Sequence, residues 1–502
     1  MAPTWKNLSD AIFAQAGARP TALAISEGDE RISYAELSEL VAKAAVSLQR
    51  LGVEPREMVG VALPTNIDHI ILSFALMRVG ALAVDLPLRL PPGFPDPVSH
   101  LKLPRVFVTA TAPPPQGAVF HRIGPEWRSE IAALHGDYRI QRLPEEPHIV
   151  NLTSGTTAAS KAILTSLTAW LARCEAGRRT VPEILDAERP PQLVLAGGMG
   201  FAYYFFFLVN QLCLGGPVVL LPEGLPLPVL ARTLAETDDA LCLLIPQVCR
   251  AFQELAPAEG PLFPRMRAMI VSATPLFVEE KRAMARQLTP NLYEIYGTSG
   301  TGFISVLRPA DLAAKPATLG SIAAGIEVSI VDGEGRAVPP GEVGHLRCRG
   351  PGMATAVHDP MPSLAQHSEG IRDDGYFPGD IGSIDVDGYL TLKGRVTDVI
   401  QRRGVEIFPP ELEEALLAHG SVAEAAVLGL TVTGSEPQVV GFVVPRHEPD
   451  KVGLAKHCRS CIPANKFPDH VYFVREIPKN PNGKPDRAQL SLIARRIQSA
   501  AG

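Results

Sequence analysis

The chain has 502 residues, which is too long for one hydrophobic core, so we expect at least two domains. Hydrophobic residues make up 46% of the sequence and charged residues 20%, the balance of a soluble globular protein. The formal net charge of -6 argues against a dedicated nucleic-acid-binding protein, because such a protein usually carries a basic excess.

The first residues contain no basic stretch followed by an apolar one, so we expect no signal peptide and a cytoplasmic location. Residues 201–221 are apolar enough to suggest a membrane span. However, Asn210 and Gln211 lie at the centre of this segment, and glycine and proline interrupt it at 215–217. We therefore expect no membrane span here, but a buried helix that leads into a strand at 218–221.

The seven cysteines do not form a recognisable disulfide framework. Cys458 and Cys461 have CxxC spacing beside His457, but no second ligand pair follows at the spacing of a zinc site. We therefore interpret them as ordinary reduced thiols and predict no protein-built metal site.

Helix-like and strand-like segments alternate in the first part of the chain. Ser33 and Glu36 have the spacing of a capping box, which predicts that a helix begins there. We expect an apolar strand at 58–63, a second helix ending at Gly80 and another strand at 81–86. This alternation predicts an α/β domain with a largely parallel sheet.

The pattern changes in the second half. Short strands between turn signals at 325–349 predict an antiparallel β subdomain. After Arg395, a strand, a helix opening at Pro409 and another strand indicate a small α+β domain. We therefore expect an α/β protein with a large N-terminal domain of mixed α/β sheets plus a β subdomain over 1–395, and a small domain over 396–502.

A hydroxyl-rich loop follows the apolar residues 148–150. Hydroxyl and backbone N–H groups with a nearby lysine can converge on phosphate oxygens. The loop lacks the spacing of a Walker loop, and alone such a cluster is often a plain solvated turn. The segment reads Thr153, Ser154, Gly155, Thr156 and Thr157, with Lys161 at its end.

Later segments place aromatic, acidic and basic residues near turns. Tyr296 and Ser299 follow an apolar segment, and Asp380 follows a turn, where its carboxylate could accept two hydrogen bonds from a ribose diol. Arg395 and Lys484 come later, each in a glycine-containing motif. Each feature alone could be a turn or a surface charge, but the order and separation of the whole set favour a common site.

These segments resemble the superfamily of acyl-CoA synthetases, peptide-synthetase adenylation domains and firefly-type luciferases, the adenylate-forming (ANL) enzymes. The resemblance runs from about residue 32 to 490 and includes 77–81, 341–344 and 403–413. It implies ATP-dependent activation of a carboxylic acid as its acyl-AMP, with ATP, Mg²⁺ and CoA as cofactors. It also implies that the small C-terminal domain is mobile and carries a catalytic lysine.

The resemblance implies a role for each matching residue. Lys484 would bridge the acyl carboxylate and the α-phosphate during adenylation. The remaining roles are phosphate binding by Thr153, Ser154, Gly155, Thr156, Thr157, Lys161 and Ser299; adenine and ribose binding by Tyr296, Gly297, Asp380 and Arg395; a hinge at Thr397; and a thiol channel at Gly404.

The chain departs from the family pattern at several of these positions. Gly300 stands where a glutamate normally assists Mg²⁺, so the metal would be held largely by nucleotide phosphates and water. The phosphate loop has Ala158, Ser160 and Ala162 in place of glycine, proline and glycine, and Thr397 replaces the usual hinge Asp or Lys.

The acyl pocket is expected around Phe201 and Ala202. Amino-acid-activating members usually have a Phe-Asp pair there, and the aspartate binds the α-ammonium. Without that carboxylate a buried ammonium would lack a partner, which favours an apolar acyl or aryl acid. The aromatic residues of 201–207 could line this pocket or pack in the core.

The acceptor of the activated acyl group stays open. The length of the chain and residues 403–413 look like those of CoA ligases, which favours an acid–thiol ligase that makes acyl-CoA. One alternative is an acyl- or aminoacyl-AMP ligase that loads a separate carrier protein. Another is a degenerate nucleotide- or acyl-binding protein without turnover, motivated by Gly300 and the altered phosphate loop.

Overall fold

Two large sheets form the first part of the fold. The computed structural model describes residues 5–88, 96–113, 117–135, 147–152, 161–358, 369–431, 436–479 and 483–501. One sheet has parallel central strands. At one of its edges, the β7–β8 and β8–β18 pairs are antiparallel. This seven-stranded sheet has the order β18 (Ala356–His358), β8 (Ala162–Ser166), β7 (Pro147–Leu152), β4 (Leu82–Asp85), β3 (Met58–Ala62), β5 (Arg105–Thr109) and β6 (Val119–Ile123).

The other large sheet also has parallel central strands, with antiparallel pairs at both edges. Its central strands, such as β11, are buried along their whole length, as expected for a sheet that is covered on both faces. The nine strands run in the order β15 (Ser321–Ile322), β14 (Gly302–Leu307), β13 (Leu292–Thr298), β12 (Ala268–Val271), β11 (Ala240–Leu244), β9 (Gln192–Leu195), β10 (Val218–Leu220), β1 (Leu23–Glu27) and β2 (Glu30–Ser33).

Buried helices connect the two sheets. Helix α3 (Ile67–Val79) contacts strands of both sheets and buries every residue except Asp68, so it belongs to a core shared by the sheets. Helix α7 (Ala202–Leu214) packs on the nine-stranded sheet and is similarly buried. The other helices of this part are α1 (Asp10–Ala18), α2 (Tyr34–Arg50), α4 (Pro97–His100), α5 (Pro125–Ala132), α6 (Leu167–Thr180), α8 (Leu227–Glu236), α9 (Pro246–Gln253), α10 (Val278–Gln287) and α11 (Pro309–Ala314).

A third sheet is the expected β subdomain. Its strand pairs are all antiparallel, including the pair that carries Asp380 opposite Arg395. Ile330, Leu346 and Leu390 form part of its own apolar cluster. The strands are β19 (Gly370–Arg372), β20 (Gly375–Phe377), β17 (Gly344–Arg349), β21 (Asp380–Ile384) and β22 (Leu390–Arg395), with β16 (Glu327–Val331) beside β17.

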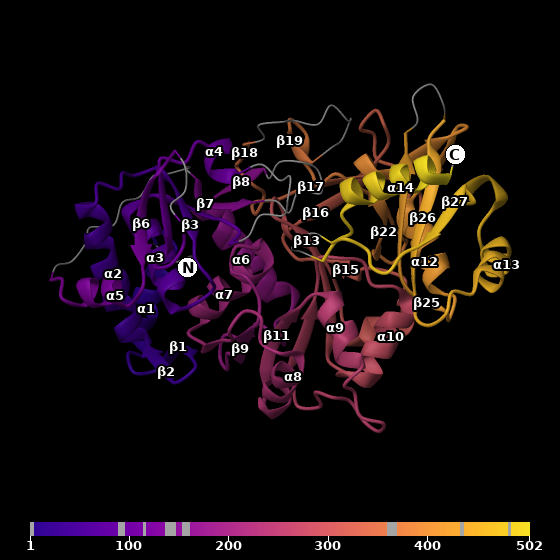
Figure 1. Ribbon diagram of the computed structural model, residues 1–502. Coiled ribbons are helices and arrows are strands. Elements are labelled where there is room, and N and C mark those ends of the chain that lie inside the picture. Colours follow the sequence, from indigo (N-terminus) through magenta and orange to yellow (C-terminus); the bar gives the residue numbers. More distant parts are fainter. Residues whose placement is uncertain are drawn as a thin grey trace.

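The chain beyond β22 packs around apolar clusters made only of residues between 400 and 494. A short 3-10 turn, η1 (Val396–Asp398), leads into this part. Figure 1 shows its sheet and helices together at the opposite end of the molecule from α1 and α2. The elements are β23 (Ile400–Arg402), β24 (Val405–Ile407), α12 (Pro409–Leu417), β25 (Val422–Leu430), β26 (Gln438–Pro445), α13 (Lys451–Cys461), η2 (Ala464–Lys466), β27 (His470–Phe473) and α14 (Arg487–Ala501).

Most of the expected elements are confirmed. Ser33 and Glu36 form the capping box at the start of α2, and residues 201–221 contain the buried α7 and then β10. In the described part of the chain, no helix has both the length and the apolar character needed to cross a membrane. All seven cysteines, including Cys458 and Cys461, are unpaired thiols, as interpreted from their spacing.

Candidate active site

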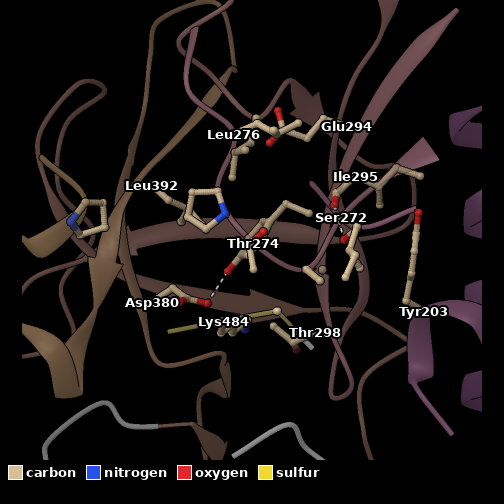
Figure 2. Close-up of a pocket in the computed structure, with 18 of the residues that line it drawn as sticks. Tyr203, Ser272, Thr274, Leu276, Glu294, Ile295, Thr298, Asp380, Leu392 and Lys484 are labelled. Atoms are coloured by element: carbon tan, nitrogen blue, oxygen red, sulfur yellow. Dashed lines mark hydrogen bonds between the residues drawn. The ribbon is translucent and has the colours of Figure 1, made fainter. Parts of the chain in front are cut away.

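A large pocket lies where the β subdomain, the nine-stranded sheet and the C-terminal part meet. Its volume of about 1220 Å³ exceeds that of an ordinary small-molecule site, which leaves room for more than one substrate. In Figure 2, Glu294 and Leu276 lie at one end of the pocket, and Asp380, Lys484 and Thr298 lie at the other.

Asp380 and Arg395 form the charged centre of the pocket. They are direct partners across the antiparallel strands β21 and β22, and Arg395 Nε lies 3.1 Å from Asp380 Oδ1. The Tyr296 hydroxyl donates a hydrogen bond to the other carboxylate oxygen, Asp380 Oδ2, at 2.5 Å. The negative charge of Asp380 raises the pKa of Arg395 above its ordinary value. The structure thus joins Tyr296 of the nine-stranded sheet to a charged pair on two consecutive strands of the β subdomain.

Irregular strand pairing aims these groups into the pocket. The β13–β14 register shifts between Tyr296 and Gly297, and the β21–β22 register shifts just after Ile381. Such bulges bend a strand and redirect its side chains. A Cβ atom at Gly297 would lie 2.1 Å from the Gly302 carbonyl oxygen, so only glycine allows this close approach of β13 to β14.

Lys484 reaches the same pocket from the C-terminal part of the chain. Burial, reinforced by the positive charge of Arg395, lowers the pKa of Lys484 to about 8. The carboxylates of Asp380, Glu369 and Asp398 partly oppose this shift. The lysine therefore lies in an electrostatic environment shared with the Asp380–Arg395 pair, although it comes from a separately packed part of the fold.

The phosphate loop itself, with Thr153, Ser154, Gly155, Thr156 and Thr157, lies outside the described residues. Its flanks are described: Leu152 on β7 pairs with Ala162 on β8, and both Leu152 and Lys161 line the pocket. Lys161 Nζ donates a hydrogen bond to the backbone carbonyl of Glu369 at 3.4 Å. The described end of the predicted phosphate segment is therefore at the pocket wall.

A buried arginine that sequence analysis missed holds the turn after β13. Arg173 on α6 donates hydrogen bonds to the carbonyl oxygens of Gly352, Ser299 and Gly300 at 2.6, 3.1 and 2.8 Å. Burial lowers the pKa of Arg173 to about 10. A single arginine on a partly apolar helix has no motif around it, so the sequence carried no signal for this role in positioning Ser299.

Two further groups at the pocket were also not singled out from the sequence. Ser272 Oγ donates to the Ile295 carbonyl at 2.7 Å, which ties the loop after β12 to β13 at the wall of the pocket. Glu294 and Lys281 form a buried ion pair at 2.6 Å, and both line the pocket. Burial raises the pKa of Glu294, while Lys281 opposes that shift.

The predicted acyl-pocket residues divide between the pocket and the core. Phe201 and Ala202 line the pocket, as do Tyr203, Tyr204 and Phe206. Phe205 and Phe207 belong to the buried core and do not line the pocket. The Tyr203 hydroxyl donates to the Ile270 carbonyl at 2.7 Å, so its polar end is already bonded.

The predicted hinge and thiol-channel residues lie outside the charged centre. Thr397 lies in η1 and lines the edge of the pocket, with its hydroxyl 3.3 Å from Asp398 Oδ1. Gly404 and Arg403 both have positive φ in the tight turn between β23 and β24. Gly404 is not among the residues that line the pocket.

Comparison with known proteins identifies the family to which the chain belongs. A model of the AMP-binding enzyme family matches residues 12–357, and a model of the AMP-binding enzyme C-terminal domain matches residues 411–484. The chain belongs to the AMP-binding enzyme family. It is therefore an adenylate-forming enzyme of the superfamily that the sequence motifs resemble.

Relatives of this AMP-binding enzyme differ in what they make. It is 26% identical to a salicyl-AMP ligase / salicyl-S-ArCP synthetase of Mycobacterium tuberculosis, over 98% of this chain and 91% of that protein. It is 28% identical to an indoleacetate–CoA ligase of Aromatoleum aromaticum, over 97% of this chain and 98% of that protein. The fold is similar to ATP-bound MatB from Rhodopseudomonas palustris, with a TM-score of 0.86, 21% identity and coverage of 98% and 99%.

The lowered pKa of Lys484 predicts an alkaline limit to adenylation. Below its pKa of about 8 the lysine is charged, and above it the cation is lost, so kcat/KM for ATP–pyrophosphate exchange should fall by about tenfold per pH unit. In Lys484→Arg the guanidinium keeps its charge over this range, so the fall should move to higher pH. The measurement is the pH profile of kcat/KM for ATP in both proteins. The same alkaline midpoint in both would contradict control by Lys484.

Proposed function

We propose that this enzyme uses ATP to activate an apolar acyl or aryl carboxylic acid as its acyl-AMP and then transfers the acyl group to the thiol of CoA. The observation that carries the proposal is the meeting of Lys484 with Asp380 and Arg395 in one pocket. Attack of a carboxylate on the α-phosphate brings two anions together, so the main tasks are charge neutralisation and alignment.

In this mechanism each charged group has a distinct task. A carboxylate oxygen of the acid attacks the α-phosphorus, the bond to the β-phosphate oxygen breaks, and pyrophosphate leaves. Lys484 neutralises the acid and the α-phosphate as they approach, and Ser299 contacts the α-phosphate. Asp380 accepts hydrogen bonds from the ribose hydroxyls, and Arg395 orients that carboxylate. Tyr296 presents its ring to adenine, and the backbone of Gly297 lies beside it at the pocket wall.

The phosphate end of ATP is assigned to the hydroxyl-rich loop and Lys161. The latter lines the pocket next to Glu369. Magnesium ion prefers one or two carboxylates together with phosphate oxygens and water, and when bound it would neutralise the triphosphate. In the described residues no cluster of three or more His, Cys, Asp or Glu side chains is arranged for a metal. We propose that the metal is carried mainly by the phosphate oxygens of the nucleotide.

The residues around the acyl pocket support an acid without an α-ammonium group. Ala202 lines the pocket with a methyl group, and Phe201, Tyr204 and Phe206 surround it with aromatic surface. Aromatic side chains offer large apolar contact areas to a flat ring. Two relatives are named for salicylate and indoleacetate, which are aromatic acids. These observations support an apolar acyl or aryl acid as the proposed substrate class.

The second half-reaction is proposed to use a different arrangement of the same parts. We assign residues 1–395 and 396–502 to two domains, and the separate apolar clusters beyond residue 400 support movement of the smaller one as a unit. Rotation at Thr397 would withdraw Lys484 and bring the turn at Gly404 toward the thiol channel. The CoA thiol would then attack the acyl carbonyl, and AMP would leave.

A carrier protein is the second candidate acceptor. The M. tuberculosis relative is named as both a salicyl-AMP ligase and a salicyl-S-ArCP synthetase, while the A. aromaticum relative is named as a CoA ligase. Both acceptors would present a thiol to the same acyl-AMP. A binding protein without turnover is the third candidate, and Gly300 is the observation that favours it.

A matched pair of acids tests the proposed substrate class. 3-Phenylpropionate and phenylalanine differ only by the α-ammonium group, which has no aspartate at position 202 to pair with. We expect ATP–pyrophosphate exchange to favour 3-phenylpropionate by about 100-fold in kcat/KM, because an unpaired buried cation is costly. In Ala202→Asp this preference should shrink or reverse. Equal exchange with both acids in the original protein would contradict an apolar or aryl substrate, and no exchange across a broad acid panel would favour the binding protein.

Replacement of Lys484 tests its proposed role in adenylation. Lys484→Ala should lower the exchange rate by roughly 10²-fold or more, because the approaching anions lose their cation. The fold should be retained, which circular dichroism and thermal melting would check. Lys456→Ala is a matched control, since Lys456 is an exposed lysine of the same C-terminal part. Exchange at the original rate in Lys484→Ala would remove the central residue from the mechanism.

The proposed hinge predicts that the two half-reactions respond differently to one substitution. Proline at position 397 fixes φ, so Thr397→Pro should slow rotation of the small domain while leaving the adenylation arrangement accessible. We expect at least about a tenfold loss of acyl-CoA formation with little change in exchange, whereas Thr397→Ala should preserve both. Mass spectrometry of the thioester and pyrophosphate exchange measure the two steps. If Thr397→Pro slowed both steps equally, or slowed neither, the result would argue against a hinge at Thr397.

A further inference from the structure

Gly300 is packed against Tyr376 of β20. A Cβ atom at position 300 would lie 2.0 Å from Tyr376 Cζ and 2.1 Å from its hydroxyl oxygen. Tyr376 is 1% exposed, so its ring has little freedom to move aside. The ring therefore fills the space that a glutamate side chain at position 300 would need. A single Gly300→Glu substitution would displace a buried aromatic ring and would not simply restore a carboxylate.

The Tyr376 hydroxyl contacts a different carboxylate. It donates a hydrogen bond to Glu369 Oε1 at 3.1 Å, and Glu369 lines the pocket from the residue just before β19. The Glu369 side chain is only 11% exposed. Its backbone carbonyl accepts a hydrogen bond from Lys161, the described end of the phosphate segment. A carboxylate thus stands at the phosphate side of the pocket, although it comes from another part of the chain.

Two of the pocket carboxylates that raise the pKa of Lys484 have different partners. Asp380 uses both oxygens, one with Arg395 at 3.1 Å and one with Tyr296 at 2.5 Å. Glu369 Oε2 also forms an ion pair with Arg395, but at 3.8 Å this contact is longer than the Arg395–Asp380 contact. Asp380 is therefore held by short contacts on both oxygens, whereas Glu369 has one short contact and an oxygen at longer range.

We propose that Glu369, held by Tyr376, supplies to the magnesium–ATP complex the carboxylate that position 300 lacks. The inference rests on the proposed function, because it assumes that ATP binds in this pocket. Tyr376 is a positioning residue: its hydroxyl orients the carboxylate, and its ring closes the space beside Gly300. The site then still has a carboxylate for the metal complex, but it comes from Glu369 and not from position 300.

A purely structural role for Glu369 predicts a different behaviour. If Glu369 only orients Arg395, its removal should disturb the Asp380–Arg395 pair and weaken ATP binding with or without metal. If Glu369 acts on the magnesium complex, its removal should weaken ATP binding only when Mg²⁺ is present. Without metal, loss of a negative charge near the triphosphate should leave ATP affinity unchanged or improve it slightly.

Calorimetric titration of ATP, in EDTA and over a series of Mg²⁺ concentrations, separates these cases for the original protein, Glu369→Gln and Tyr376→Phe. For Glu369→Gln we expect the Mg²⁺ concentration at half-maximal ATP binding to rise by about tenfold, with affinity in EDTA changed by less than about twofold. Tyr376→Phe should give a smaller rise in the same direction. Glu342→Gln is the matched control, because Glu342 is an exposed glutamate in a turn of the same β subdomain.

The outcomes are distinct. An unchanged Mg²⁺ dependence in Glu369→Gln, or equal weakening with and without metal, would overturn the inference. If Glu369→Gln failed to fold, the shift in Tyr376→Phe and the bound Mn²⁺ signal in electron paramagnetic resonance of its ATP complex would decide in its place. Pyrophosphate exchange by the original protein is read separately, so ATP binding without exchange would count against the ligase function and not against Glu369. Absence of ATP binding in the original protein would overturn both.

Discussion

Asp380 and Arg395 face each other across two antiparallel strands and form an ion pair. The charges of this pair act on the other charged groups of the pocket. Arg395 carries a cation next to Lys484, and burial together with that cation lowers the lysine pKa to about 8. Asp380 and Glu369 oppose this effect. The pocket therefore holds its cations close enough together to attract a polyanion, while its carboxylates keep those cations charged near neutral pH.

Local structure explains why this pair can be held so firmly. Both residues lie on strands of a sheet with its own apolar cluster, and Tyr296 joins them from the nine-stranded sheet through its hydroxyl. Arg173 bonds two carbonyl oxygens of the turn that follows β13, and a third at Gly352 joins that turn to a distant segment. Asp380 thus has a partner on each oxygen, and the buried Arg173 holds the neighbouring turn, so these groups are directed before any substrate arrives.

Much of the fold could be predicted from local patterns, because capping boxes, apolar runs and glycine turns are governed by neighbouring residues. The capping box at Ser33 and the change from the α7 helix to the β10 strand are examples. Part of the candidate site could be predicted from the sequence for another reason: Asp380, Arg395 and Lys484 lie in recognisable motifs. Their meeting in space depends on strand register and on how the C-terminal part packs, and neither is encoded in a local pattern.

The roles of Arg173 and Glu369 could not be predicted from local sequence patterns. Arg173 lies on a helix without a motif, and its importance comes from three carbonyl oxygens on distant segments. Glu369 becomes informative only once Tyr376 is seen to fill the space beside Gly300. The sequence alone marks Gly300 only as a departure from the family pattern, whereas the structure shows that the Tyr376 ring fills the space beside it. A substitution at a family position can therefore mark the relocation of a chemical group as readily as its loss, and the two are distinguished by what occupies the vacated volume.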